Sequence, residues 1–371
     1  MKIIFQLLFV SFALNLCAQN SHLLVGTYTK GKSEGIYVYN FNTNTGAFSL
    51  EGKVKTPDPS YLALSPNQQF VYAVNEEGNN KIGGNVTAFK FNRQSGQLTR
   101  INQQLSGGDH PCFVAVDKTG KWLAVANYSG GSLSVFPVQA NGAVGKVTSF
   151  IQDTGKGFNK ERQEKAHVHS CFFSKDNRYL FVADLGLDKE FIYLFNEKTG
   201  KLTPAPQAFE KSEPGSGPRH IDFHPNGRYI YLIEELTGTV VTYKYNDGKL
   251  KTIQRISAAP SDFKGFMGSA DIHVSPDGKF LYCSNRGESN TITIFSINTA
   301  TGKLTSIGQQ PTMGKAPRNF NFDPSGNFLL VANQDSDNII IFKRDKATGL
   351  LTDTGKKIEV GNPVCLKWAS K

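Results

Sequence analysis

Apolar and polar residues alternate along most of the chain in short runs that Gly, Asn, Asp or Pro interrupt. The run from Gly217 to Glu235 is typical, because two alternating segments flank a Pro-Asn-Gly turn at residues 225–227. A period of two indicates β-strands, and Pro-Asn-Gly supplies a tight turn, so this run predicts an antiparallel hairpin. In such a hairpin the start of the first strand lies beside the end of the second. The prediction therefore places Arg219 and Glu235 at the same edge of a sheet.

The same hairpin element recurs along the chain. Each copy begins at a Ser, Asp or His and ends ten residues later at an Asn, Asp or Glu. Successive starts are 52, 57, 50, 51 and 48 residues apart, a period that is typical of four-stranded propeller blades. The copies are Ser65–Asn75, Asp117–Asn127, Ser174–Asp184, His224–Glu234, Ser275–Asn285 and Asp323–Asn333.

A second repeated element, a turn centred on glycine, occurs seven times and thus once more than the hairpin. Its copies are Thr45-Gly46, Ser95-Gly96, Asn141-Gly142, Thr199-Gly200, Asp247-Gly248, Thr301-Gly302 and Thr348-Gly349. The first glycine turn has no complete blade before it, and the C-terminal strand has none after it. Pairing residues 363–368 with residues 23–28 completes a seventh blade and protects two edge strands. We therefore predict an all-β fold, a single seven-bladed β-propeller over residues 19–371 that is closed by pairing of its N- and C-terminal strands.

The start of the chain has the pattern of a secretory signal. Lys2 is followed by an apolar run over residues 3–16, which is too short to span a membrane. We predict a signal peptide over residues 1–18, cleaved after Ala18, and a periplasmic or secreted protein. A lipid anchor at Cys17 is the alternative, and we expect no other contact with a membrane.

The other four cysteines and the net charge narrow the function classes. The cysteine spacing fits neither a zinc site nor a compact disulfide framework, so we predict buried thiols. The net charge of +10 over 371 residues is spread over turns. No basic run is interleaved with aromatic residues, so we predict no nucleic-acid partner. A mildly positive surface would still attract an anionic substrate.

Two positions in each blade are predicted to meet at one rim near the central axis. The first follows the usual proline and carries Ser60, Cys112, His169, Arg219, Ala270, Arg318 and Val364. The second follows the end of the hairpin element and carries Glu76, Tyr128, Leu185, Glu235, Arg286 and Gln334, with Tyr28 as the expected seventh member. A structural repeat needs no charge at either position. The charged side chains therefore indicate a polar pocket, and His167 lies just ahead of the first position in its blade.

Three arginines on this rim favour an anionic substrate. Arginine binds phosphate or carboxylate oxygens through a planar fork, and a nearby Glu or His can activate water. The structural alternative is that these residues form salt bridges between blades. Three arginines outnumber the plausible carboxylate partners, which favours the pocket. His167 and His169 share a strand face near Asp184, but this is a weak metal signal and we predict no metal.

Several segments on the rim resemble a known family. They are Ala166-His167-Val168-His169-Ser170, Asp184-Leu185-Gly186, Gly217-Pro218-Arg219-His220, Glu234-Glu235-Leu236, Ser284-Asn285-Arg286-Gly287 and Ala316-Pro317-Arg318. Together they resemble the lactonase family of seven-bladed propellers, which includes propeller-type 6-phosphogluconolactonases and fungal carboxymuconate-lactonising enzymes. The resemblance covers the chain after the leader and implies the active-site residues His169, Arg219, Glu235 and Arg286. From the same rim we take four substrate-binding candidates, His167, Arg318, Glu76 and Tyr128.

The resemblance implies a lactone hydrolase that needs no cofactor and acts on a small anionic sugar lactone, with 6-phosphogluconolactone as the leading substrate. Arginines would stabilise the oxyanion that forms when water attacks the carbonyl, and Glu235 or His169 would be the general base. One alternative is a carboxymuconate-type lactonising enzyme (a cycloisomerase). The other is a non-catalytic exported propeller that binds a glycan or protein, an alternative for which the aromatic residues Tyr28 and Tyr128 leave some room. The leader departs from a cytosolic pentose-phosphate role, and we expect a monomer.

Overall fold

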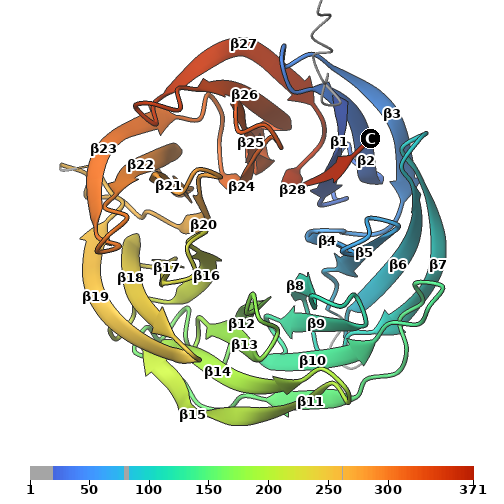
Figure 1. Cartoon of the computed structure of the whole chain (residues 1–371), viewed down its shortest axis with the longest axis vertical. Helices are drawn as coiled ribbons and strands as arrows, with labels where there is room; N and C mark the ends of the chain where they lie inside the picture. Colours follow the sequence, from blue (N-terminus) through green and yellow to red (C-terminus); the bar gives the residue numbers. More distant parts are fainter. Residues whose placement is uncertain (1–19, 79–82, 261) are drawn as a thin grey trace, which may run out of the picture.

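Four-stranded antiparallel sheets stand around a central axis like propeller blades in the computed structural model (Figure 1). The structure describes residues 20–78, 83–260 and 262–371. These residues contain 28 strands in seven sheets and one short 3-10 helix, η1 (Gln334–Ser336). The all-β, seven-bladed propeller predicted from the sequence is therefore confirmed. The predicted leader over residues 1–18, with Cys17, lies outside the described residues. Within the described ranges, no helix has the length and apolar character needed to cross a membrane.

Each blade places one strand at the axis and three farther out. The innermost strands are β4 (Leu62–Leu64), β8 (Pro111–Val116), β12 (Val168–Phe173), β16 (Pro218–Phe223), β20 (Ser269–Val274), β24 (Pro317–Phe322) and β28 (Pro363–Ser370). The second strands are β1 (Asn20–Thr27), β5 (Phe70–Asn75), β9 (Trp122–Asn127), β13 (Tyr179–Asp184), β17 (Tyr229–Glu234), β21 (Phe280–Asn285) and β25 (Phe328–Asn333).

The two outer layers of strands complete the blades. The third strands are β2 (Gly35–Asn42), β6 (Asn85–Asn92), β10 (Ser132–Pro137), β14 (Lys189–Asn196), β18 (Thr239–Asn246), β22 (Thr291–Ile297) and β26 (Asn338–Arg344). The outermost strands are β3 (Phe48–Lys55), β7 (Gln97–Leu105), β11 (Ser149–Gln152), β15 (Lys201–Lys211), β19 (Lys249–Ser257), β23 (Leu304–Pro311) and β27 (Leu351–Glu359).

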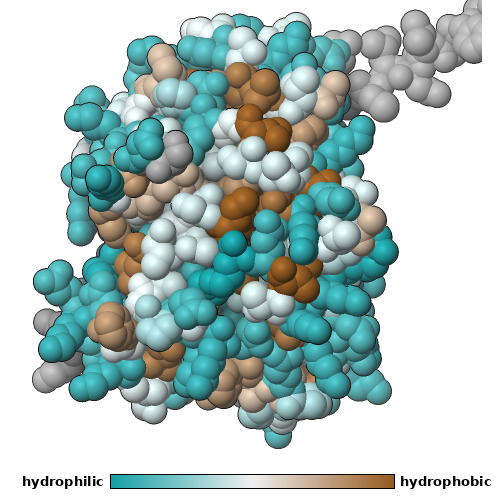
Figure 2. Space-filling view, turned by 90° about the vertical axis from the view of Figure 1, so that its left-hand side faces the viewer, coloured by the Kyte–Doolittle hydropathy of each residue, from teal (hydrophilic) through white to brown (hydrophobic). Residues whose placement is uncertain are grey.

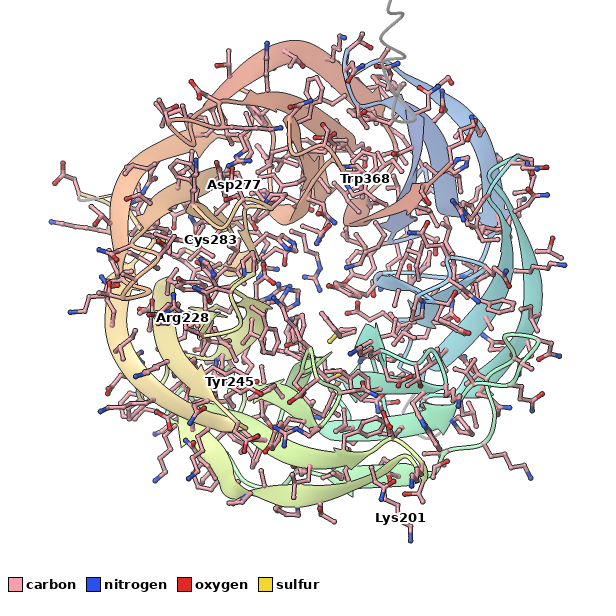
Figure 3. The ribbon with its side chains drawn as sticks, viewed as in Figure 1. Lys201, Arg228, Tyr245, Asp277, Cys283 and Trp368 are labelled. Atoms are coloured by element: carbon pink, nitrogen blue, oxygen red, sulfur yellow. The ribbon has the colours of Figure 1, made fainter. Side chains whose placement is uncertain are left out.

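The first and last strands meet in one blade. β28 lies next to β1, and the two strands pair antiparallel, with Leu23 opposite Trp368 and Val25 opposite Leu366. β2 and β3 continue this sheet outward. The predicted pairing of the terminal strands is confirmed, and Figure 3 labels Trp368 on β28 beside β1. The ring therefore closes only when both ends of the chain contribute to the same sheet.

Burial follows the distance of each strand from the axis. The second strands β9, β13 and β25 are buried along their whole length, because neighbouring blades stack against both of their faces. Strands covered on both faces read as continuous apolar runs rather than as alternating ones. The outermost strands β3 and β27 carry many exposed residues. The outer side in Figure 2 is accordingly mainly hydrophilic, with scattered apolar side chains. The buried free thiols are those predicted, Cys112, Cys171, Cys283 and Cys365.

A left-handed backbone residue shapes the turn between the first and second strand. Gly227 has a φ of 71°, which glycine adopts without steric cost. The equivalent residues Gln68, Gly120, Asn177, Gly278 and Gly326 also have positive φ. At the other end of the β16–β17 hairpin, the Glu235 amide donates to the Gly217 carbonyl at 2.7 Å. The hairpin therefore holds Arg219 and Glu235 at one edge, as the sequence predicts.

Candidate active site

Three adjoining cavities lie along the axis, where side chains of the innermost strands extend into the ring (Figure 3). The outer chamber has a volume of about 490 Å³ and is lined by the exposed residues Phe266 and Lys315, among others. The inner chamber, of about 210 Å³, shares Arg286 and Arg318 with it. A floor cavity of about 10 Å³ adjoins the inner chamber at His169. The site thus narrows from an open mouth to a buried floor that has room for about one water molecule.

The two predicted rim positions converge on these cavities. First-position side chains from six blades line the floor cavity, namely Ser60, Cys112, His169, Arg219, Arg318 and Val364. The seventh, Ala270, accepts a hydrogen bond from Arg219 through its carbonyl. Second-position side chains line the two chambers, namely Tyr28, Glu76, Tyr128, Glu235, Arg286 and Gln334. Leu185 is the exception, because it is fully buried in the core. The repeat therefore brings side chains from every blade to one site.

The Glu235 carboxylate contacts three arginines, Arg162, Arg219 and Arg286. Its Oε1 accepts a hydrogen bond from Nη2 of Arg162 at 2.6 Å, and its Oε2 accepts one from Nε of Arg219 at 2.9 Å. Nη2 of Arg286 lies 3.0 Å from the same Oε2. Burial opposes ionisation, but the charges of the three arginines hold the pKa of the Glu235 carboxyl well below its usual range. Such a carboxylate is a weak base, so its geometry suits orienting arginines better than accepting a proton.

Arg162 is a site residue that the sequence analysis did not single out. It lies on the long loop between β11 and β12, and its Nη2 is also 3.3 Å from the hydroxyl oxygen of Tyr128. β11 extends to Gln152, so the loop begins at Asp153. The sequence marks this loop only through the spacing of 57 residues between Asp117 and Ser174, the longest of the five spacings between hairpin elements. Nothing in the repeat identifies Arg162, because this connection is longer than the corresponding ones in the other blades and its extra residues have no equivalent there.

Arg286 and Arg318 present different donor groups to the chambers. Nε of Arg286 donates to the carbonyl of Gly268 at 2.8 Å. Burial and the nearby arginines lower the pKa of Arg286 to about 10, against the pull of Glu235. Arg318 stands over the ring of Tyr28, 5.5 Å from its centroid. Within the part of the chain that the structure describes, the Arg318 guanidinium makes no hydrogen bond or ion pair. Its N–H groups are therefore available to an anion in the inner chamber.

His169 and His167 occupy different layers of the site. The Nδ1 atom of His169 is buried and has no hydrogen-bond partner among the described residues. Burial, followed by the charge of Arg219, lowers the pKa of His169 well below its ordinary value, so the imidazole is neutral. His167 instead stacks on Tyr128 at a centroid distance of 4.5 Å and lies 3.1 Å from Glu164 Oε1. His167 does not line the chambers but supports Tyr128 from behind.

Tyr28 and Glu76 complete the inner chamber. The Tyr28 hydroxyl donates to Oε2 of Glu76 at 2.8 Å, and burial raises the pKa of Tyr28 well above its usual range. The phenol therefore remains a donor at neutral pH.

Of the eight site residues predicted from the sequence, seven line the chambers or the floor cavity and His167 does not. Across the described ranges, no three His, Cys, Asp or Glu side chains are grouped so as to hold a metal ion.

Comparison with known proteins identifies the family. The model of the lactonase family, described as a seven-bladed β-propeller, matches residues 22–368. A 6-phosphogluconolactonase from Formosa agariphila is 44% identical over 93% of this chain and 98% of its own length. For a 6-phosphogluconolactonase from Bacillus subtilis the identity is 40% over 93% and 97%, respectively.

Solved structures of similar proteins agree with this match. The crystal structure of a putative 6-phosphogluconolactonase from Bacteroides fragilis is 42% identical, with a TM-score of 0.90 over 95% of this chain and 99% of that one. A periplasmic gluconolactonase from Pseudomonas aeruginosa is 38% identical, with the same TM-score and the same coverage. The chain therefore belongs to the lactonase family of seven-bladed β-propellers.

Proposed function

We propose that this protein hydrolyses a sugar lactone to its acid and that 6-phosphogluconolactone is its leading substrate. The main support is the pair formed by Arg318 and His169 in the inner chamber. Among the described residues, nothing accepts a hydrogen bond from the Arg318 guanidinium, and Nδ1 of the neutral His169 has no hydrogen-bond partner. Relatives named 6-phosphogluconolactonase and gluconolactonase favour hydrolysis of a sugar lactone over the lactonising and the purely binding alternatives.

The sizes and charges of the two chambers support a phosphorylated substrate. The inner chamber, of about 210 Å³, has room for a six-membered lactone ring. The outer chamber is larger and carries Lys315 near its mouth, where a phosphate on C6 would lie once the ring is inside. Arginine and lysine are the side chains that most often bind phosphate in proteins. An unphosphorylated gluconolactone would fit the inner chamber but would leave Lys315 unused.

In the proposed reaction, His169 accepts a proton from the water that attacks the lactone carbonyl. Arg318 and Arg286 donate to the carbonyl oxygen as negative charge develops there, which stabilises the transition state. The protonated His169 then returns its proton to the ring oxygen as the C–O bond breaks. Glu235 keeps Arg286 in place throughout. An anionic substrate also raises the pKa of His169 towards its ordinary value, so the base becomes stronger when substrate is bound.

Turnover of a panel of lactones tests this proposal. The purified protein is mixed with 6-phosphoglucono-δ-lactone, glucono-δ-lactone and a lactone that carries two carboxylates, and each rate is compared with spontaneous hydrolysis. The proposal expects the highest kcat/KM for the phosphorylated lactone. Preference for the dicarboxylate would favour the lactonising enzyme instead. Binding without turnover of any lactone would favour the non-catalytic propeller and reject the proposal.

We further propose that the protein is exported, with residues 1–18 as its signal peptide. The apolar run at residues 3–16 and the periplasmic gluconolactonase relative support export. N-terminal sequencing of the protein from its native host should find a start at Gln19 or a lipidated Cys17. Intact protein that begins at Met1 and is found in the cytoplasm would contradict export. It would also restore a place in intracellular sugar metabolism.

A further inference from the structure

Beneath the inner chamber, four titratable side chains follow one another in a row, which we call the His–Asp row. Nδ1 of His220 lies 2.8 Å from Oδ1 of Asp271, and Oδ2 of Asp271 lies 3.0 Å from Nε2 of His273. Nδ1 of His273 lies 4.0 Å from Oδ2 of Asp222. His220 and Asp222 belong to β16, and Asp271 and His273 belong to β20. The row therefore runs between two neighbouring innermost strands.

The row begins at the floor of the site. His220 lines the floor cavity together with His169, and the two ring centroids are 5.2 Å apart. The cavity volume of about 10 Å³ is near the space that one water molecule needs. A water there would find polar partners in both imidazoles and in Arg219, which also lines the cavity. One water would thus connect the general base with His220 by hydrogen bonds.

The row ends at solvent on the opposite side of the ring. Exposure of its side chains is 5% at His220, 2% at Asp271, 23% at His273 and 32% at Asp222. Arg219 marks the site end of β16, and Asp222 lies three residues farther along, about 10 Å at the usual rise of a strand. The side chains therefore lead from the buried floor to partly exposed groups farther along the innermost strands.

Charges along the row keep its members in different protonation states. Burial and the charge of Arg219 lower the pKa of His220 to about 4, although Asp271 opposes this. Burial works against ionisation of Asp271, but His273 and hydrogen bonds from both imidazoles hold its pKa well below its usual range. Burial also works against a charge on His273, yet Asp271 raises its pKa above the ordinary value. His220, at the site end of the row, is therefore neutral and can accept a proton. His273, farther along, holds a proton more readily than a free imidazole does.

We infer that the His–Asp row conducts the proton released by each turnover to the far side of the propeller. This inference rests on the proposed function, because hydrolysis of a lactone to a carboxylate releases one proton at neutral pH. Water adds its oxygen to the carbonyl carbon, and its first proton passes through His169 to the ring oxygen as the C–O bond breaks. The second proton leaves the new carboxylic acid as it ionises. No oxidant, reductant or further reactant is needed.

That second proton has a path that avoids the occupied chambers. A water held in the floor cavity would pass it to Nε2 of His220, which lies 3.5 Å from Nη1 of Arg219, while the proton on Nδ1 of His220 passes to Asp271. His273 first gives its Nδ1 proton to Asp222, which delivers it to solvent. A turn of the neutral His273 ring then presents the deprotonated nitrogen to Asp271, which passes the next proton to it. Substrate or product above the floor would slow escape through the mouth. The row is thus most useful when the site is saturated, so that its loss lowers kcat more than kcat/KM.

Kinetics of His273→Gln in the full-length protein test this inference. We expect kcat for 6-phosphoglucono-δ-lactone in weak buffer to fall about fivefold, with kcat/KM changed by less than about twofold. Added imidazole, a small proton carrier, should restore kcat. Asp271→Asn should behave in the same way. His22→Gln is the matched control, because Nδ1 of His22 also contacts a carboxylate, at 2.6 Å from Glu51 Oε2, but away from the site. Its kcat should be unchanged.

Two results would overturn the inference. An unchanged kcat in His273→Gln shows that protons leave by another route. A loss of kcat that imidazole does not restore, together with a lower melting temperature, shows that the row only holds neighbouring blades together. The failure of the proposed function looks different, because the wild type itself would then show no turnover and the inference would fall with it.

Discussion

One carboxylate balances most of the positive charge in the site. Glu235 contacts Arg162, Arg219 and Arg286, whereas Arg318 has a tyrosine ring as its neighbour instead of an acid. Removing one partner from a buried set of charges leaves the others uncompensated and costs about 3–5 kcal/mol. Three of the arginines are therefore bound into the structure, and the fourth is free for ligand. Both the salt-bridge and the pocket interpretation of these residues apply, because Arg286 pairs with Glu235 and still lines both chambers, whereas Arg318 faces the inner chamber without an ion pair among the described residues.

Arg318→Lys tests the role of the free guanidinium. The substitution keeps the positive charge but loses the planar fork that matches a phosphate or carboxylate. We expect kcat/KM for the phosphorylated lactone to fall at least about tenfold, which corresponds to roughly 1.4 kcal/mol of transition-state stabilisation. The melting temperature should change little, because the Arg318 guanidinium makes no hydrogen bond or ion pair with the described residues and lysine keeps a cation near the Tyr28 ring. Arg344→Lys is the control, since Arg344 is buried against Asp277 far from the chambers. It should lower stability and leave turnover per folded molecule intact.

The pH dependence of kcat/KM tests His169 as the general base. The base must be neutral, and burial with the nearby arginines lowers its pKa well below 6.5. Activity should therefore stay level as the pH falls from 8 through about 6.5 and should drop only at more acidic pH. His169→Gln should remove this acidic limb together with most of the activity. An inflection near the ordinary histidine value would point to an exposed imidazole and reject His169.

At the scale of elements, the hairpins could be predicted from the sequence and the loops could not. The start of each first strand and the end of each second strand recur at fixed spacing, so their convergence follows from the register. The loop that carries Arg162 is the longest connection of its kind, and no repeat fixes where the side chains of its extra residues point. His167 shows the other limit. It is close in sequence to His169, but it lies behind Tyr128, because β12 begins at Val168 and has a register shift there.

The Asp188 carboxylate connects the Arg162 loop to the start of β16. Oδ1 of Asp188 accepts hydrogen bonds from Nε2 of Gln163 at 2.7 Å and from the Gly217 amide at 2.9 Å. Gln163 is fully buried and also donates to the carbonyl of Leu185 at 2.8 Å. This network links the loop to the start of β16, which carries Arg219. The position of Arg162 relative to Glu235 thus depends on a side chain that never meets the substrate.

Gln163→Leu tests this anchor. The variant keeps the approximate size of the side chain and removes its hydrogen bonds, which should cost about 1–3 kcal/mol of stability. We expect kcat/KM to fall about tenfold, because Arg162 and Glu235 lose their fixed geometry. Gln207→Leu is the matched control on β15, where Gln207 donates to Glu210 at 2.7 Å on the outer strand. Equal kinetic effects in both variants would show that the loop does not position the site.

At the scale of the whole molecule, ring closure decides whether a site exists. The floor cavity is lined by Ser60 just before β4 and by Val364 of β28, residues from opposite ends of the chain. Closure could be predicted because the sequence has seven glycine turns but only six hairpin elements, so the seventh blade needs strands from both ends of the chain. The depth and shape of the cavities could not, because they depend on how large side chains from all blades share the axis. Arg219 illustrates this point, since it is nearly fully buried although it is charged.

Deleting residues 361–371 tests closure directly. The deletion removes β28, which pairs with β1 and contributes the fully buried Leu366 to the core. β1 would then become an exposed edge strand, and the floor cavity would lose its wall at Val364. We expect no cooperative unfolding transition above 25 °C. Leu366→Ala disturbs the same strand less severely. It should lower the free energy of unfolding, measured by chemical denaturation, by about 2–5 kcal/mol. Removing Lys371 alone is the control, because its pair with Glu51 is on the surface and should contribute at most about 1 kcal/mol. A deletion variant that melts like the wild type would show that six blades and an open seventh suffice, and the closed ring would no longer explain how the site forms.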